Sequence, residues 1–403
     1  MDLAAFHALR APAGAALLDR ITATGPLTDA TALRLGTKLR GEHPADLVAA
    51  AITQARLRER GAAKFGAAAA SMWFTSDGLE QATHPAVAAH RAARLARHLA
   101  SGAAVVDLCC GIGSDLAAAA QVGLRATGVE LDPLTAAMAA ANLGNAAAVI
   151  QADAQTHDTG GAAVFVDPAR RGSRGRVFDP AAYTPPFPFV TDLLGSGRPA
   201  AAKVAPGIPH GLVPAGVEAE WVSLRGEVKE AALYSPALSD STVRRATLLP
   251  GGHTLHANVE ESARPGAPLG PVGRWLHEPD GAVIRAHLID GVAAEIDGRL
   301  VDPSIAYLTT DHPVATPFAR SYEVHDVLPF DTRRLRTMLR ARGVGRLTVK
   351  KRGADIDPDR LRRDLLRGAT GDAEATLVIT RVAGAHSALL VTPMPGNSQF
   401  QRD

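Results

Sequence analysis

The sequence predicts an α/β protein built on a Rossmann-like parallel sheet of about seven strands, with a helical N-terminal region and a small C-terminal α+β domain. Short apolar runs alternate with helix-like segments from residue 103 onward, which is the pattern of βαβ units. The first 100 residues hold little strand-like pattern, and Pro and Gly concentrate at 262–274. These patterns predict four segments: a helical region at 1–100, the sheet domain at 101–262, a linker and connecting segment at 263–320 and the C-terminal domain at 321–396.

Length and composition agree with a globular protein of several domains. The chain has 403 residues, of which 46% are hydrophobic and 21% are charged. No apolar run approaches the roughly 18 residues of a membrane helix, and the first residues lack the pattern of a secretory signal. Cysteine occurs only as the adjacent pair Cys109 and Cys110, which excludes a disulfide framework. We therefore expect a cytoplasmic location.

Apolar periodicity locates the elements of each domain. Amphipathic helices are expected at 46–64 and 85–99. The strands of the central sheet are expected at 104–108, 125–130, 147–151, 163–166, 201–204, 220–224, 230–234 and 245–249. In the C-terminal domain we expect strands at 324–328, 346–350, 375–380 and 388–392, and helices at 331–341 and 357–366.

A glycine-bearing bend at 107–115 follows the first strand and precedes a helix. Gly111 and Gly113 let the backbone turn tightly and approach a ligand where a Cβ would not fit. The helix after the bend presents free N–H groups at its start. A nicotinamide fingerprint would need a third small residue at position 116, where this chain has Leu116.

Acidic residues follow the next two strands. Glu130 ends the second strand 17 residues after Gly113, near the spacing at which α/β folds place a carboxylate on ribose hydroxyls. Asp153 follows the third strand, where it could reach an adenine amino group. Each acid alone could be a turn residue or a helix cap. With Asp107, three acids at successive strand ends indicate a nucleoside cofactor.

These residues resemble the motifs of class I S-adenosylmethionine-dependent methyltransferases. The resemblance covers about residues 80–250 and is carried by Asp107-x-x-x-Gly111-x-Gly113, Glu130-Leu-Asp-Pro133 and Asp167-Pro168-Ala169-Arg170. It implies S-adenosyl-L-methionine as cofactor. It also implies that Asp107, Gly111 and Gly113 hold the methionine end, Glu130 the ribose and Asp153 the adenine.

A second resemblance concerns the segment before the bend. Met72-Trp73-Phe74 and Ala82-Thr83-His84-Pro85 resemble the segment that precedes the cofactor loop in trimethylguanosine synthases. A Thr-Pro pair lies near the cofactor in that family, which implies Thr83 as a cofactor contact.

The segment Asp167 to Gly172 ends the fourth strand, where base-methylating enzymes carry their substrate motif. Amino-group methyltransferases are similar but have Pro-Pro and an aromatic residue after the first position. Uracil-C5 methyltransferases resemble it more, yet they need a downstream cysteine, and this chain has none after Cys110. Direct transfer remains, with Asp167, Pro168 and Arg170 as the catalytic set. Asp167 would orient or deprotonate the nucleophile, or it caps the next turn.

Two groups of basic residues predict a nucleic-acid partner. Arg170, Arg171, Arg174 and Arg176 lie within seven residues beside the expected active site and suit phosphate oxygens. A solvated loop, or pairing with Asp167 or Asp179, is the other interpretation. Residues 330–382 hold 14 Lys and Arg against 7 Asp and Glu.

The C-terminal region resembles the THUMP-like domain found after some bacterial methyltransferases. The carrying residues are 302–309, Val349-Lys350-Lys351-Arg352-Gly353, Asp357-Pro358 and Leu361-Arg362-Arg363. The resemblance implies RNA binding. We therefore expect an S-adenosylmethionine-dependent enzyme that methylates a base in RNA, either tRNA or rRNA. A small-molecule methyltransferase and an RNA-binding protein with a vestigial cofactor site are the alternatives.

Overall fold

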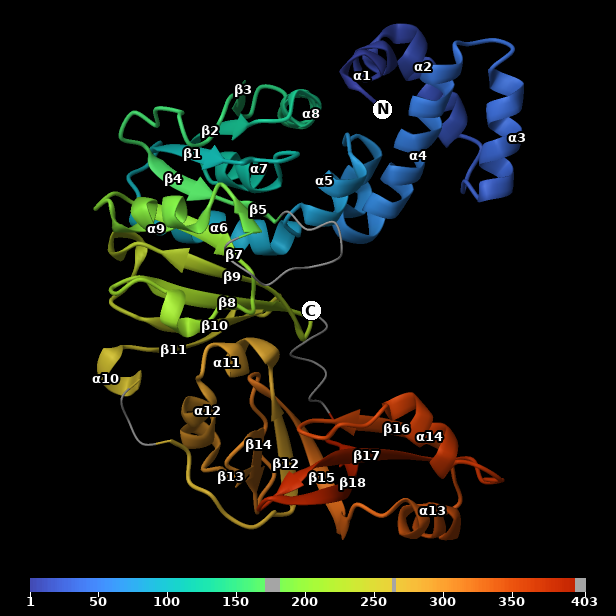
Figure 1. Cartoon of the computed structure of the whole chain (residues 1–403), viewed down its shortest axis with the longest axis vertical. Coiled ribbons are helices and arrows are strands. Elements are labelled where there is room, and N and C mark those ends of the chain that lie inside the picture. The colour runs from blue at the N-terminus through green and yellow to red at the C-terminus, as the bar shows by residue number, and fades with distance from the viewer. Residues whose placement is uncertain (171–181, 263–265, 396–403) are drawn as a thin grey trace. The chain divides into compact units, whose positions relative to one another are not determined.

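The computed structural model describes residues 1–170, 182–262 and 266–395 (Figure 1). The chain divides into two compact units. The first comprises Met1–Val217 and Ala232–Asp240, and the second comprises Glu218–Ala231 and Ser241–Asp403. No helix in the described part of the chain has the length and apolar character needed to span a membrane.

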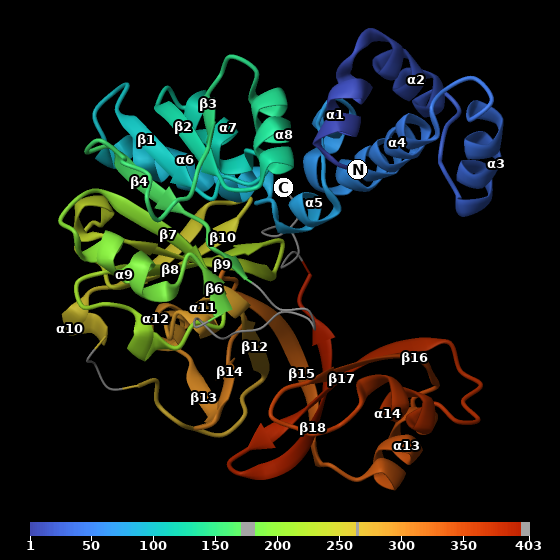
Figure 2. The same cartoon turned by 45° about the horizontal axis from the view of Figure 1, so that its top comes forward.

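The first unit begins with helices, as predicted. A core that includes Leu9, Ile21, Leu39 and Val48 holds the first four helices together. Figure 2 shows these helices in blue. Asp2 and Thr28 cap two of them with side-chain oxygens, which satisfies the free N–H groups of their first turns. The bounds are α1 Leu3–Arg10, α2 Pro12–Thr22, α3 Asp29–Leu39, α4 Ala45–Phe65, η1 Gly66–Ala70, α5 Ser76–Gln81 and α6 Pro85–His98.

The central sheet has nine strands in the order β11-β10-β8-β9-β7-β4-β1-β2-β3. β1 pairs in parallel with β2 and β4, β2 with β3, and β4 with β7, so their carboxyl ends meet at one edge. The strands are β1 Ala104–Leu108, β2 Arg125–Glu130, β3 Ala148–Gln151, β4 Ala163–Val166, β7 Ala200–Val204, β8 Glu218–Leu224, β9 Glu227–Tyr234, β10 Arg244–Leu249 and β11 His253–Ala257. Helices α7 Ser114–Gln121, α8 Pro133–Leu143 and α9 Phe187–Gly195 lie between strands in the sequence.

The predicted α/β fold is confirmed, but the sheet is wider than about seven strands. The strand that the sequence pattern missed is β11, which pairs antiparallel with β10 at the edge of the sheet. Its first four residues, His253 to His256, are not buried, so the strand carries no apolar run.

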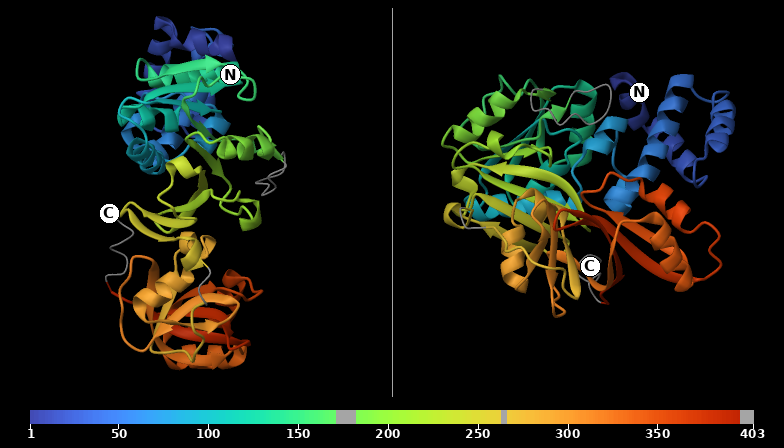
Figure 3. Two further views of the ribbon diagram at one scale, coloured as in Figure 1. Left: turned by 90° about the vertical axis from the view of Figure 1, so that its left-hand side faces the viewer. Right: turned by 60° about the horizontal axis from the view of Figure 1, so that its bottom comes forward.

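The second unit holds a seven-stranded sheet of order β13-β14-β12-β15-β18-β17-β16 (Figure 3, orange to red). Leu335 and Leu339 of one helix and Leu361 and Leu365 of another pack on it. The strands are β12 Trp275–Pro279, β13 Arg299–Asp302, β14 Ile305–Thr310, β15 Ala319–Pro329, β16 Val344–Lys351, β17 Ala373–Val382 and β18 Ala385–Pro393. The helices are α10 Val259–Ser262, α11 Gly281–Arg285, α12 Ile289–Ile296, α13 Thr332–Ala341 and α14 Pro358–Leu365.

Candidate active site

The bend after β1 depends on left-handed backbone conformations. Gly111 and Gly113 have φ values of +55° and +90°, and Cys109 has φ +68°. A Cβ on Gly113 would lie 3.0 Å from Leu143 Cδ1, whereas a Cβ on Gly111 would meet no described atom within 4 Å. The bend therefore leaves open space at Gly111, where a ligand could approach the backbone.

The two cysteines of the bend are free thiols. Burial raises the pKa of the Cys109 and Cys110 thiols, so both stay protonated at neutral pH.

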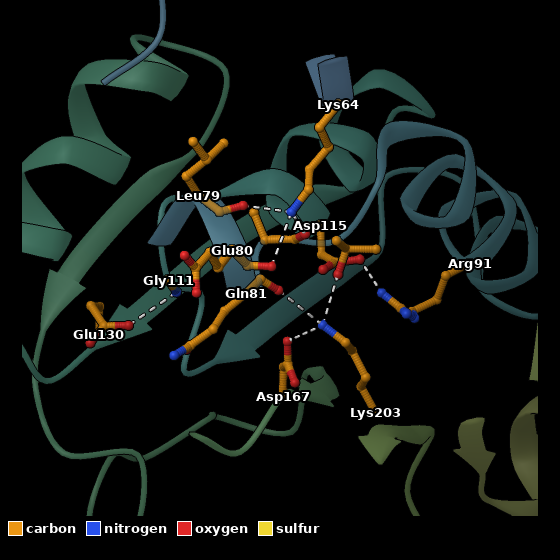
Figure 4. Close-up of polar contacts among 12 residues, drawn as sticks. Lys64, Leu79, Glu80, Gln81, Arg91, Gly111, Asp115, Glu130, Asp167 and Lys203 are labelled. Carbon is orange, nitrogen blue, oxygen red and sulfur yellow. Dashed lines mark hydrogen bonds and ion pairs between the residues drawn. The ribbon is translucent and has the colours of Figure 1, made fainter. Parts of the chain in front are cut away.

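Glu130 links the end of β2 to the bend (Figure 4). Its Oε2 accepts a hydrogen bond from Gly111 N at 3.0 Å, and its Oε1 accepts one from Asp132 N at 3.0 Å. Burial raises the pKa of Glu130 above its usual value, although the backbone N–H groups act in the opposite direction. The structure thus brings the second predicted acid directly against the first glycine.

Asp153 follows β3 and forms its own turn. Its Oδ1 accepts a hydrogen bond from Gln155 N at 2.9 Å. The backbone next to Asp153 lies at the carboxyl edge of the sheet, because Ala152 N donates a hydrogen bond to Glu130 O at 3.1 Å. One oxygen of Asp153 is therefore engaged locally, at the end of the sheet where Glu130 also lies.

Asp107 is the most deeply buried of the predicted acids. Its residue is 3% exposed, and neither carboxylate oxygen has a hydrogen-bond partner among the described residues. Burial raises the pKa of Asp107 well above its usual value, and the nearby Asp115 and Asp167 raise it further. A buried carboxylate without partners is costly, so this position calls for a cationic group.

A buried ion pair lies behind Asp107. Arg91 of α6 pairs with Asp115 of α7, and its guanidinium lies 4.4 Å from the centre of the Phe165 ring. These three residues and Asp107 are among those that line a small cavity. Arg91 is not among the residues that the sequence motifs predict. An arginine on the apolar side of an amphipathic helix is the signal that could have found it.

Asp167 at the end of β4 is held by Lys203 of β7 (Figure 4). Lys203 Nζ donates to Asp167 Oδ2 at 2.6 Å, to Thr83 Oγ1 at 3.1 Å and to Gln81 O at 3.5 Å. The structure thus brings together Asp167 and Thr83, for which the sequence predicts different roles. Lys203 is not among the residues that the sequence motifs predict. A lysine within a fully buried strand was the available signal.

A second lysine holds the same segment from the other side. Lys64 of α4 donates to the carbonyl oxygens of Leu79 at 2.5 Å, Glu80 at 3.1 Å and Ala82 at 2.9 Å. Exposed helices commonly carry lysines, so no sequence signal distinguished Lys64. The segment 79–83 is therefore fixed between two ammonium groups.

The motif after Asp167 forms a short ribbon. Pro168 is buried, and β5 Ala169–Arg170 pairs antiparallel with β6 Tyr183–Thr184. Ala205 N, just after β7, donates to Tyr183 Oη at 3.0 Å. The backbone of Arg170 thus lies beside the site, whereas Arg171, Arg174, Arg176 and Asp179 lie outside the described residues.

Comparison with known proteins decides the family. Two curated relatives come from Mycobacterium tuberculosis strains CDC 1551 / Oshkosh and ATCC 25618 / H37Rv. Each is named an uncharacterized S-adenosylmethionine-dependent methyltransferase and is 40% identical over 349 residues, 83% of this chain and 93% of the relative. The chain belongs to the S-adenosylmethionine-dependent methyltransferases.

Two sequence profiles and one solved structure complete the comparison. The methyltransferase matches the THUMP domain-like family at residues 319–393 and a domain of unknown function at residues 2–61. A candidate methyltransferase from Porphyromonas gingivalis W83 shares its fold, with a TM-score of 0.72 and 23% identity over 88% of this chain and 92% of that chain. The predictions of a SAM-dependent methyltransferase, of this cofactor and of a C-terminal THUMP-like domain are confirmed.

The methyltransferase site fits S-adenosylmethionine in charge and in space. The partnerless Asp107 carboxylate complements a cationic group such as the ammonium of the cofactor. The open space at Gly111 admits a ligand close to the backbone.

Proposed function

We propose that this methyltransferase transfers a methyl group directly to a base in cytoplasmic RNA, either tRNA or rRNA. The observation that carries the proposal is the state of Asp167. Lys203 occupies its Oδ2, and its Oδ1 makes no hydrogen bond with a described residue. The Asp167 side chain is 27% exposed, and a carboxylate at the carboxyl edge of the sheet, beside the glycine bend, is suited to accept the proton of a nucleophile.

The cofactor contacts in this proposal are those that the resemblance to class I methyltransferases implies. Asp107, Gly111 and Gly113 hold the methionine end, Glu130 holds the ribose, Asp153 holds the adenine, and Thr83 is a further contact. The bound cofactor supplies a methyl group that is already activated, so the chain mainly aligns the reactants and excludes water. Pro168 and Arg170 shape the substrate side next to Asp167.

The THUMP-like part supports RNA as the substrate class. Asp331 caps α13 and Asp357 caps α14, and both helices bury leucines and expose arginines. The side chains of Arg333, Arg334, Arg360, Arg363 and Arg367 form no ion pair or hydrogen bond with another described residue, so they are available for phosphate oxygens.

The Lys350-Lys351-Arg352 run contributes less to such a surface than its charge predicts. Lys350 pairs with Glu278 and donates to Tyr322 Oη at 2.7 Å. Lys351 donates to Ile356 O at 2.5 Å, and the Arg352 guanidinium lies 5.3 Å from the centre of the Tyr307 ring. These cations stabilise the fold of the domain, and the helix arginines are the better candidates for contacts to RNA.

We also propose the domain division that the sequence predicts. Residues 1–100 form a helical region, 101–262 the methyltransferase domain, 263–320 a connecting segment and 321–396 the RNA-docking domain. Truncated proteins that begin or end at these boundaries test the division. Their solubility and the cooperativity of their unfolding are compared.

The experiment is methyl transfer from radiolabelled S-adenosylmethionine to total tRNA and to rRNA, followed by mass spectrometry of the nucleosides. The wild-type enzyme should label one base in one of the two fractions, and Asp167→Asn should lower that transfer by at least about 100-fold. Labelling of small metabolites with no labelling of RNA would overturn the proposal. Binding of RNA without binding of the cofactor would favour a vestigial site.

A further inference from the structure

Lys203 occupies a position that is unusual for a lysine. It belongs to β7, whose five residues are all buried, and the residue is 9% exposed. Lysine is seldom buried unless its ammonium is paired. Here the pairing group is Asp167, the acid at the end of the neighbouring strand β4.

The contacts of the ammonium join two parts of the site. It donates to Asp167 on the substrate side, and to Gln81 O and Thr83 Oγ1 on the segment before α6. An ammonium has three donors, so Lys203 can bond to several oxygens at once. Among the described residues, Lys203 is the one cation that pairs with Asp167.

The pair is asymmetric in its exposure. The Lys203 side chain is 10% exposed, whereas the Asp167 side chain is 27% exposed. The anchoring lysine is therefore more deeply buried than the acid that it holds. With Oδ2 fixed, Oδ1 is held in one orientation.

We propose that Lys203 is a positioning residue for methyl transfer. It holds Asp167 so that Oδ1 accepts a hydrogen bond from a proton-bearing nitrogen of the target base. This inference rests on the proposed function, since it takes Asp167 as the acceptor of the substrate proton.

The reaction balances with Lys203 unchanged. The nitrogen of the base forms a new N–C bond to the transferred methyl group. The C–S bond of S-adenosylmethionine breaks, and the electron pair of that bond stays on sulfur. The N–H proton passes to Asp167 Oδ1 and then to water. Lys203 keeps its three protons throughout and stays hydrogen-bonded to Asp167 Oδ2.

Lys64 provides a matched control. It fixes the same segment through the carbonyl groups of Leu79, Glu80 and Ala82 and has no contact with Asp167. A loss of activity caused only by loosening of this segment should appear in Lys64→Met as well as in Lys203→Met. A loss that depends on Asp167 should appear in Lys203→Met alone.

The test measures kcat and KM on the RNA that the wild-type enzyme methylates, and the Kd of S-adenosylmethionine by calorimetry. We expect Lys203→Met to lower kcat by about 10–100-fold, because misplaced catalytic groups cost rates of that order. The cofactor Kd should stay within about threefold, and Lys203→Arg should lose less kcat than Lys203→Met because it keeps the positive charge beside Asp167. Lys64→Met should change kcat by no more than about threefold.

Two outcomes would overturn the proposal, and they differ. If Lys203→Met and Lys64→Met have the same kcat, Lys203 has only a structural role. The proposed function then still stands. If the wild-type enzyme labels no RNA, the proposed function fails and the role of Lys203 fails with it.

Discussion

Glu130 Oε2 and the backbone amide of Gly111 lie 3.0 Å apart, so the acid at the end of β2 is bonded to the glycine bend after β1. This hydrogen bond joins the two motifs from which the sequence predicts the cofactor site. It also fixes the bend in the conformation that leaves space beside Gly111.

The two glycines of the bend should respond differently to alanine. Gly113→Ala places a Cβ 3.0 Å from Leu143 Cδ1 in addition to the strain of φ +90°, so we expect about 2–3 kcal/mol of lost stability. Gly111→Ala adds only the strain, about 1–2 kcal/mol, yet its Cβ enters the space for the ligand. Urea unfolding and cofactor titration check this. If the two variants lost equal stability and equal affinity for the cofactor, this prediction would be wrong.

We expect Asp107 to lower the stability of the cofactor-free protein and to be needed for binding of S-adenosylmethionine. We expect Asp107→Asn to raise the Tm of the cofactor-free protein by ~2–4 °C, because it removes a buried carboxylate without partners. The same change should abolish the Tm increase that S-adenosylmethionine produces in the wild-type protein. Thermal unfolding with and without cofactor measures both effects.

The advantage of Asp107→Asn should depend on pH. Burial raises the pKa of Asp107, so the folded protein binds this proton more tightly than the unfolded chain does. The contribution of Asp107 to stability is therefore fully present at pH values below its pKa in the unfolded chain. It is lost as the pH rises through its pKa in the folded protein. The Tm difference between variant and wild type should shrink as pH is lowered from 7 toward 4. A constant difference would show that Asp107 does not titrate in this range.

Arg91 should be essential for the fold around the site. Arg91→Met leaves Asp115 without its ion-pair partner and removes a cation that lowers the pKa of the buried Asp107, so we expect a loss of about 3–5 kcal/mol in the free energy of unfolding. The double change Arg91→Met with Asp115→Asn should recover part of that loss, because it removes the stranded charge. Chemical denaturation of the three proteins tests this. A loss below about 1 kcal/mol in the single variant would mean that the pair is dispensable.

We expect the basic residues of the THUMP-like part to have two different roles, RNA binding and stabilisation of the fold. Arg360→Glu with Arg363→Glu should weaken RNA binding and reduce the slope of log K against log salt by about 2, with little change in Tm. Lys350→Met should instead lower stability by about 1–3 kcal/mol, since Glu278 loses its ion pair. Filter binding at several salt concentrations and thermal unfolding measure the two effects. RNA binding lost in Lys350→Met at unchanged Tm would reverse this assignment.

The sequence by itself determined the fold class, the glycine bend and the acids at the strand ends. These features are local: a positive φ favours glycine within a few residues, and parallel strands bring their carboxyl ends to one edge. The pattern of residues alone therefore places Gly111, Gly113, Glu130 and Asp153 near one another.

Only the tertiary structure decided which charges meet. Lys203 and Asp167 are 36 residues apart in sequence, Arg91 and Asp115 are 24 apart, and Lys350 and Glu278 are 72 apart. Such pairs depend on which strands become neighbours and which side chains are buried, and neither is encoded in a short window of sequence. The same reason explains why Lys350 has the sequence pattern of a surface cation and is an internal partner of Glu278.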